Sequence, residues 1–136
     1  MVANVHVRTV VAFTALVLAA VGAAAAEDLL RRSATIDLPG PPAQRFDYLL
    51  VDRDDNWLIS AHLAASQTYV IDLATNKVIA TIKDTPGVEG LAYVPDERKL
   101  YTSNSGDNTV GVVDLNTFRV VRKIPTEAKP DGIAFA

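Results

Sequence analysis

VIDLATNKVIATI at residues 70–82 and VVDLNTFRVVRKI at residues 112–124 are two copies of one pattern, 42 residues apart. The correspondence extends over residues 65–93 and 107–135, where eight of 29 positions are identical. Six more positions hold chemically similar side chains, among them Glu89 with Asp131 and Tyr93 with Phe135. The sequence therefore predicts a protein built from repeated units rather than around one independent core.

Each repeat contains four short segments with strand character, separated by residues that favour turns. The expected strands cover residues 48–52, 57–62, 68–72 and 77–83 in the first copy, and 91–94, 99–104, 110–114 and 119–124 in the second. After residue 26 no segment has a helical apolar period. A repeat of about 40–50 residues made of strands is typical of β-propeller blades. We predict an all-β fold of four-stranded antiparallel meanders, with about two blades in an incomplete ring.

The boundaries follow from the repeat. Residues 27–44 form a lead-in, 45–89 the first blade and 90–131 the second, and residues 132–136 repeat the opening of residues 90–94 and are expected to begin a third. Residues 33–38 alternate in polarity and are expected to form an outermost, ring-closing strand, which Pro39 ends. We expect the remaining blades to come from the rest of a longer chain. The alternatives are a ring of several short chains and an open two-sheet domain.

Residues 1–26 have the pattern of an export signal rather than of a folded segment. Arg8 precedes an uncharged apolar run over residues 9–21, and residues 22–26 are small side chains that a signal peptidase accepts. The run is short for a membrane span, although an uncleaved anchor is the alternative. We expect a periplasmic or secreted protein with no membrane span after cleavage.

Composition restricts the partners. Beyond residue 26 the chain has a formal charge of −4 and no cysteine. The mild negative charge argues against broad binding to nucleic acid or anionic membranes. The missing cysteines exclude disulfides and thiolate metal sites, which suits the periplasm.

The stretch LYTSNSGDNTVGVVD at residues 100–114 resembles the signature of the YVTN-type β-propeller repeat. The flanking residues 120–125 and 130–134 also resemble that family, although the core motif is shuffled at residues 101–104 and is reduced to its strand pattern at residues 58–62. The resemblance covers residues 45–136. It implies an exported, typically seven-bladed bacterial propeller, and it leaves the activity open because fold does not choose function.

The signature residues have a structural interpretation. Asn104, Ser105, Asp107 and Asn108 carry short polar side chains that bond to nearby backbone, and Asp72 and Asp114 are placed to begin turns. In propellers, the loops between second and third strands and those between blades share one face, which usually binds ligands. The residues expected on this ligand face are Arg45, Phe46, Asp47, His62, Glu89, Asn104, Lys129 and Asp131.

Several chemistries compete on that face. His62 is the one histidine after residue 26, so a serine-hydrolase mechanism would depend on it alone, and no nucleophile elbow accompanies it. Glu89 or Asp47 with Asn104 could contribute to a lactonase-like divalent metal site, and the acidic turn at residues 52–56 superficially resembles a calcium loop. Binding of single-stranded nucleic acid is only weakly indicated, by an aromatic residue and two basic residues expected on this face: Phe46, Arg45 and Lys129.

We therefore expect a scaffold that binds an unknown protein or small ligand, with no cofactor assigned. The alternative is a propeller enzyme, such as a metal-assisted lactone hydrolase or a subunit of a periplasmic oxidoreductase.

Overall fold

The computed structural model describes residues 31–42 and 45–136. The expected export signal, residues 1–26, lies outside the described residues, as does part of the lead-in. The chain divides into two units, Met1–Ser33 and Ala34–Ala136.

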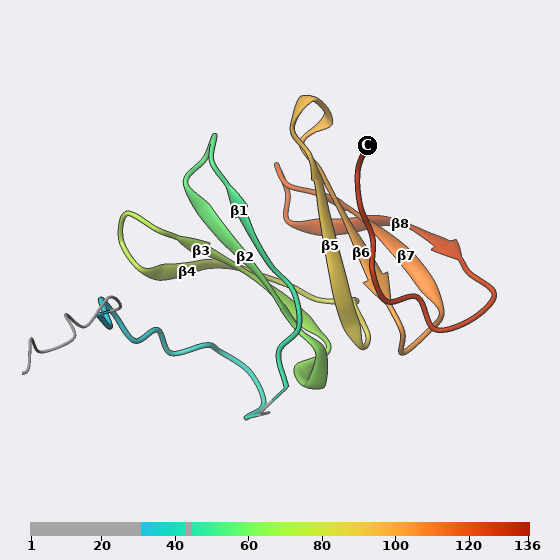
Figure 1. Ribbon diagram of the computed structural model, residues 1–136, viewed down its shortest axis with the longest axis horizontal. Coiled ribbons are helices and arrows are strands. Elements are labelled where there is room, and N and C mark those ends of the chain that lie inside the picture. Colours follow the sequence, from blue (N-terminus) through green and yellow to red (C-terminus); the bar gives the residue numbers. More distant parts are fainter. Residues whose placement is uncertain (1–30, 43–44) are drawn as a thin grey trace, which may run out of the picture. The chain divides into compact units, whose positions relative to one another are not determined.

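Eight strands form two four-stranded sheets, each in simple sequence order (Figure 1). Sheet A contains β1 (Leu49–Asp52), β2 (Trp57–His62), β3 (Gln67–Asp72) and β4 (Lys77–Ile82). Sheet B contains β5 (Val88–Val94), β6 (Lys99–Asn104), β7 (Thr109–Asp114) and β8 (Arg119–Pro125). All neighbouring strands are antiparallel, and the described helices are two single 3-10 turns, Leu63–Ala65 and Pro95–Glu97. The prediction of two four-stranded meanders is confirmed.

The turns repeat as faithfully as the strands. Left-handed backbone occurs at three pairs of positions 42 residues apart: Asn56 and Arg98, Ser66 and Asn108, Asn76 and Phe118. Asparagine adopts this conformation readily, whereas a bulky phenylalanine is an outlier there. The turn geometry is therefore a property of the blade, and the second blade maintains it at two of the three positions with residues that do not favour it, Arg98 and Phe118.

Each blade also carries a β-bulge at the same place. The register between β3 and β4 shifts after Val70, and that between β7 and β8 shifts after Val112. The extra residue is Ile79 in the first blade and Val121 in the second, and both side chains are exposed. The repeat thus extends to the irregularities of the outer strands.

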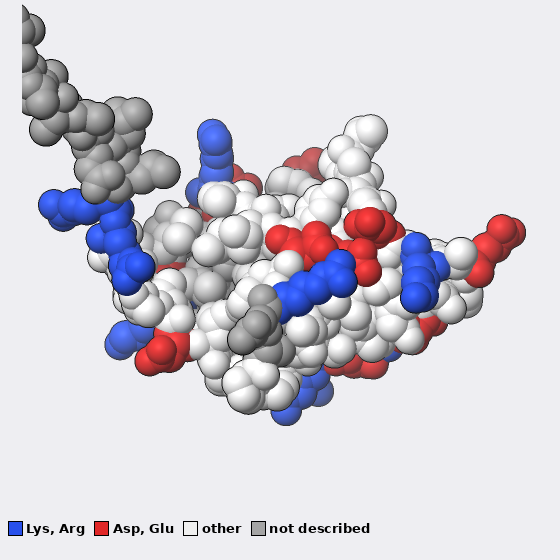
Figure 2. All heavy atoms as spheres, turned by 60° about the horizontal axis from the view of Figure 1, so that its bottom comes forward, with Lys and Arg blue, Asp and Glu red and all other residues white. Residues whose placement is uncertain are grey.

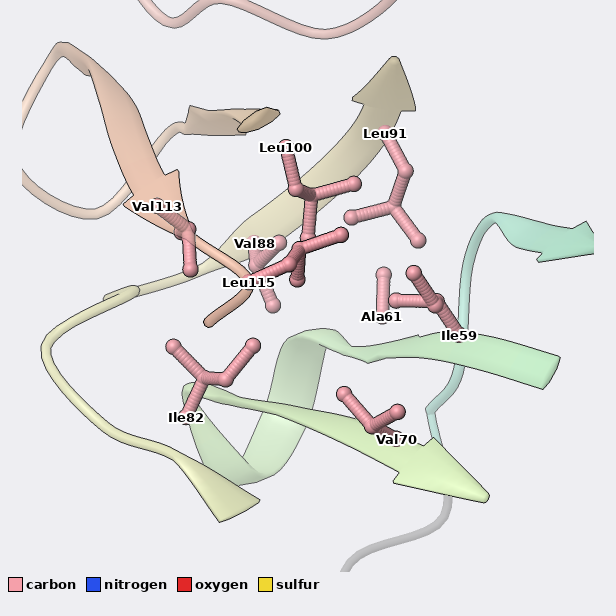
Figure 3. Close-up of a cluster of buried hydrophobic side chains, with 9 residues drawn as sticks. All are labelled: Ile59, Ala61, Val70, Ile82, Val88, Leu91, Leu100, Val113 and Leu115. Atoms are coloured by element: carbon pink, nitrogen blue, oxygen red, sulfur yellow. The ribbon is translucent and has the colours of Figure 1, made fainter. Parts of the chain in front are cut away.

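The core lies in the seam between the two sheets (Figure 3). Ile59 and Ala61 alternate along β2, as expected for one buried face of a sheet, whereas Val88 and Leu91 on β5 are three residues apart because the register shifts between them. Sheet A contributes Ile59, Ala61, Val70 and Ile82; Val88, Leu91, Leu100, Val113 and Leu115 face them from the second blade. Trp57 packs against this cluster and is partly buried. The two sheets are therefore stacked like neighbouring blades.

The predicted strand at residues 33–38 is not observed: these residues have no strand structure and pair with neither described sheet. Farther along the lead-in, the Tyr69 hydroxyl donates to the carbonyl oxygen of Pro39 (2.5 Å), which holds this part of the chain against sheet A. Whether residues 33–38 close a ring stays a prediction.

Residues 132–136, which we call the tail, are also without strand structure. The tail nevertheless lies on sheet B: a Cβ atom on Gly90 would meet the Asp131 carbonyl oxygen at 2.5 Å and Ile133 Cγ2 at 3.0 Å. Position 90 therefore needs glycine because the tail approaches so closely. That the tail begins a third blade stays a prediction.

Candidate functional site

The loops that follow β2 and β6 meet the connection between the blades on one face of the unit, which we call the loop face. The Gly87 amide donates to Ser66 Oγ (3.0 Å), and the Ser105 and Gly106 amides donate to the carbonyl oxygens of Gly87 and Pro86. The inter-blade connection is thereby held between the two β2–β3-type loops. This is the arrangement that was expected for the ligand face.

An aromatic stack lies at the end of β2. The ring of Phe46 stacks on that of His62 with 3.9 Å between centroids and 13° between planes, and the Tyr69 ring is tilted against His62 at 5.7 Å. His62 is buried, whereas 44% of Phe46 is exposed. Burial raises the pKa of Tyr69. The stack presents one aromatic face to solvent on a support that is itself buried.

Backbone pairing places the residues around this stack. The Asp47 amide donates to the Ala61 carbonyl (3.1 Å) and the Ala64 amide to that of Arg45 (3.1 Å), so residues 45–47 run beside the end of β2. The Tyr48 amide donates to the Glu89 carbonyl (3.4 Å). The structure thus brings Arg45, Phe46, Asp47, His62 and Glu89 into one neighbourhood.

Asn104 is also on the loop face, but it is fully buried. Its amide nitrogen donates to Thr109 Oγ1 (3.1 Å), and its oxygen accepts from Thr102 Oγ1 (3.0 Å). These bonds satisfy the side chain within the second blade. The structural interpretation of this signature asparagine accounts for its contacts, and no ligand is needed to explain them.

The Asn104 bonds continue into an ion-pair network that joins the blades. Thr109 donates to Asp107, and Lys123 Nζ contacts both Asp107 (2.7 Å) and Asp84 of the inter-blade connection (2.6 Å). Burial opposes the charged form of Asp107, but hydrogen bonds from Lys123 and Thr109 outweigh it and lower its pKa. The pKa of Lys123 is raised, since the bonds to Asp107 and Asp84 outweigh its burial. The network stabilises the loop face electrostatically.

Lys129 and Asp131 follow β8 in the chain, and both are exposed. The Asp131 carbonyl accepts a hydrogen bond from Ser103 Oγ, which in turn accepts from the Gly90 amide (2.7 Å). Asp131 therefore has a defined backbone position, whereas no described contact positions the Lys129 side chain.

Sequence reasoning missed a second cluster, at the opposite end of the seam. Arg98 pairs with Asp55 of the first blade and lies over the Trp57 ring, 5.6 Å from its centroid. The Trp57 ring also contacts that of Phe118, with 5.4 Å between centroids. The repeat could have placed Arg98 near Trp57, because positions 56 and 98 are equivalent and both lead into a second strand. We call this cluster the seam latch.

The seam latch region argues against the calcium-loop hypothesis for residues 52–56. Asp52 Oδ1 accepts from the amides of Asp54 (3.0 Å) and Asp55 (3.4 Å), so the acidic residues organise the turn and the ion pair. Asp52 and its neighbours also influence Tyr93: burial first, and then the charge of Asp52, raises the pKa of Tyr93. Within residues 31–42 and 45–136, no group of His, Asp or Glu is arranged to hold a metal ion.

Two hollows lie away from the aromatic stack. One, of about 470 Å³, lies between the outer strands and is lined by Thr81, Lys83, Asp84, Thr117, Phe118, Arg119 and Val120. The other, of about 220 Å³ and largely apolar, lies between sheet B and the tail. Acidic and basic side chains lie side by side on the face shown in Figure 2, without a continuous field of either sign.

No family model and no curated protein match this chain. Among solved structures, it is similar to hydrazine synthase of Kuenenia stuttgartiensis, with 25% identity, a TM-score of 0.63 and 77% of this chain covered. It is also similar to AztD of Citrobacter koseri (17% identity, TM-score 0.59, 73% covered) and to the β-propeller domain of Cps50 (Swd1) of Myceliophteria thermophila (18%, 0.56, 64%).

These likenesses establish the fold. The chain is an all-β protein with about two blades of a β-propeller, and it spans 28% of each of these three chains. The YVTN family itself is not supported by a family match. In the part of the chain that the structure describes, no helix is long and apolar enough to cross a membrane.

Proposed function

We propose that this chain is part of an exported β-propeller scaffold that binds a small ligand or a protein through its loop face. The observation that carries the proposal is the exposed ring of Phe46, stacked on buried His62 beside Arg45, Asp47 and Glu89. Rigid scaffolds commonly present binding residues on loops in this way. Asn104, by contrast, serves the blade and is not part of the proposed contact surface.

The proposal is tested by locating binding on the molecule. The ¹⁵N-labelled chain is titrated with a panel of small organic acids, amines and sugars, with Ca²⁺ and with Zn²⁺, and amide shifts are followed by NMR. Perturbations should gather at residues 45–47, 62–66 and 84–89. Perturbations confined to the turns at the other end of the strands, residues 72–76 and 114–118, would contradict it.

A matched pair of variants gives the control. Phe46→Ala removes the exposed ring and should weaken binding of any probe found, whereas Val121→Ala truncates an exposed apolar side chain on β8 and should leave it unchanged. Equal loss in both variants would show that binding is not located at the aromatic stack.

Export is a separate part of the proposal and rests on residues 1–26. The chain is expressed from its full coding sequence in a bacterium with a periplasm, and the mature N-terminus is sequenced. Cleavage before Glu27 with recovery in the periplasmic fraction is expected. An uncleaved chain in the membrane fraction would favour the anchor alternative.

The enzyme alternative is kept open by one comparison, since one of the similar structures is hydrazine synthase. Activation by Ca²⁺ or Zn²⁺ of lactone hydrolysis, absent in Glu89→Gln, would favour the metal-assisted hydrolase. No turnover, with binding on the loop face, would favour the scaffold.

A further inference from the structure

The hollow of about 470 Å³ between the outer strands, which we call the outer groove, is distinct from the aromatic stack of the loop face. Thr81, Lys83 and Asp84 line it from blade one, at the end of β4, and residues 117–120 line it from blade two, where the chain enters β8. Both walls therefore belong to the two blades that the structure describes. Pockets for small molecules commonly have about 300–1,000 Å³, so the outer groove has the size for a small ligand.

Two cations in the outer groove have no acidic partner. Lys83 and Arg119 are exposed, and neither forms an ion pair within residues 31–42 and 45–136. The one carboxylate among the lining residues, Asp84, is already bound by Lys123 (2.6 Å). The outer groove consequently has an excess of positive charge on a chain whose formal net charge is −3. Its charge is complementary to that of an anion.

An aromatic ring lines the same groove. Phe118 is half-buried, and its ring contacts that of Trp57 in the seam latch, with 5.4 Å between centroids. Val120 lies next to it on the groove wall and packs against the core cluster. The outer groove thus combines a supported apolar wall with two unpaired cations.

The backbone at Phe118 departs from what its side chain favours. Its φ is 54°, and the equivalent residue of blade one is Asn76, with a φ of 55°. Asparagine tolerates this left-handed conformation, whereas a bulky residue is strained there. Backbone strain of this kind persists where surrounding contacts compensate it, and it is concentrated at ligand sites. Blade two therefore carries an aromatic ring at the groove in place of the residue that suits the turn.

We propose that the outer groove binds a small aromatic carboxylate. Lys83 and Arg119 donate charge-assisted hydrogen bonds to the carboxylate oxygens. The aromatic part of the ligand packs on Phe118 and Val120, where ring contacts add to the burial of apolar surface. The Thr81 hydroxyl on the groove wall is a further donor. This binding is independent of the contact surface proposed for the loop face.

Benzoate is the probe for the outer groove. The ¹⁵N-labelled protein, purified after expression from its full coding sequence, is titrated with sodium benzoate at constant ionic strength, and amide shifts are followed by NMR. Saturable shifts should appear at residues 81–83 and 117–120, with a dissociation constant of about 1–10 mM, because the ligand has few atoms. Benzamide has the same ring and no charge, and it should bind about tenfold more weakly. The absence of saturable shifts at these residues, or equal affinity for benzamide, would overturn the proposal.

Single-charge variants locate the carboxylate. Arg119→Gln and Lys83→Gln each remove one cation from an exposed side chain and should each lower the affinity for benzoate about threefold. Lys77→Gln is the matched control, because Lys77 is the repeat equivalent of Arg119 and is exposed on β4 but does not line the groove. Phe46→Ala, which changes the loop face, should also leave the affinity unchanged. A loss in Lys77→Gln as large as that in Arg119→Gln would contradict the proposed site.

Two substitutions of the ring test the apolar part of the site. Phe118→Tyr keeps an aromatic face and should hold the affinity for benzoate within about twofold, whereas Phe118→Leu keeps apolar packing without the ring and should lower it about threefold. The amide spectra of both variants show that the fold is retained. Equal affinities of the two variants would exclude the ring contact with the ligand.

Discussion

The two blades differ in how they hold the buried residue at the end of the second strand, next to the loop face. In blade two, Asn104 is buried and bonded to two threonines. In blade one the equivalent residue is His62, which is buried and contacts the rings of Phe46 and Tyr69. Hydrogen bonds close the loop within one blade, whereas ring stacking closes it in the other and leaves Phe46 partly exposed. Departure from the repeat, rather than agreement with it, locates the candidate site.

The blades also differ in what covers them. Leu100 and Leu58 are repeat equivalents, but Leu100 is buried in the seam and Leu58 is half-buried on the face of sheet A away from the seam. Leu100→Ala should lower the free energy of unfolding by about 2–5 kcal/mol, and Leu58→Ala by about 1 kcal/mol. Urea unfolding followed by Trp57 fluorescence measures both. Equal losses of unfolding free energy in the two variants would mean that Leu58 and Leu100 are buried to the same extent.

A smaller effect is expected where hydrogen bonds close the loop. Asn104→Ala leaves Thr102 and Thr109 without their amide partner and should cost about 1–3 kcal/mol. Asn116→Ala, which loses one exposed bond from Arg98, should cost about 0.5 kcal/mol or less. If the two urea midpoints shift equally, Asn104 does not stabilise the blade in the way its contacts indicate.

The seam latch should contribute about 1 kcal/mol. Arg98→Met removes the Asp55 ion pair and the cation over Trp57 while keeping an unbranched side chain. The loss should appear in urea unfolding, and Trp57 emission should shift to the red as water reaches the ring. Arg119→Met, an exposed arginine on β8, is the control. A red shift in that variant too would mean that Trp57 reports general loosening.

The smallest effect should depend on pH. Lys123→Met removes the partner of Asp107 and Asp84, and the stability difference from the unchanged chain should be about 0.5–1 kcal/mol at neutral pH. Because folding lowers the pKa of Asp107, this contribution is present above the unfolded carboxyl value of about 4 and is lost as pH falls through the folded value. Because folding raises the pKa of Lys123, it is also lost as pH rises through the folded lysine value, above about 10.4.

Thermal unfolding of both proteins from pH 3 to pH 11 measures that dependence. A difference that persists undiminished at pH 3 would show that Lys123 stabilises the fold by packing rather than by charge. Lys77→Met, an exposed lysine on β4, gives the baseline.

Periodicity predicted the sheets well because alternation of buried and exposed positions is local information. The second strands, 57–62 and 99–104, were predicted with the bounds that the structure has. The first strand of sheet B begins three residues before the prediction, at Val88, because the register shifts between Val88 and Leu91. The Gly90 amide there bonds Ser103 Oγ. Such an irregularity depends on a contact that periodicity does not encode.

The sequence indicated which residues share the loop face, but it did not indicate which of their side chains contact one another. Arg45–Asp47 and His62 were expected on the loop face, yet the stacking of Phe46 on His62 depends on how residues 45–47 pair with residues 61–64. The seam latch joins Arg98 to Asp55, 43 positions apart, through a left-handed turn that arginine rarely adopts. Both contacts arise from the stacking of sheets, which no single segment specifies.

The bulges at Ile79 and Val121 bear on aggregation through the outer strands of the two sheets. Edge strands with a straight row of free amides and carbonyls act as templates on which further strands add to form cross-β fibres. One extra residue bends each outer strand and interrupts that row at the same height in both blades. A strand from another chain therefore cannot continue the ladder of β4 or β8 past the bulge, and the rim resists polymerisation even though it exposes an isoleucine and a valine.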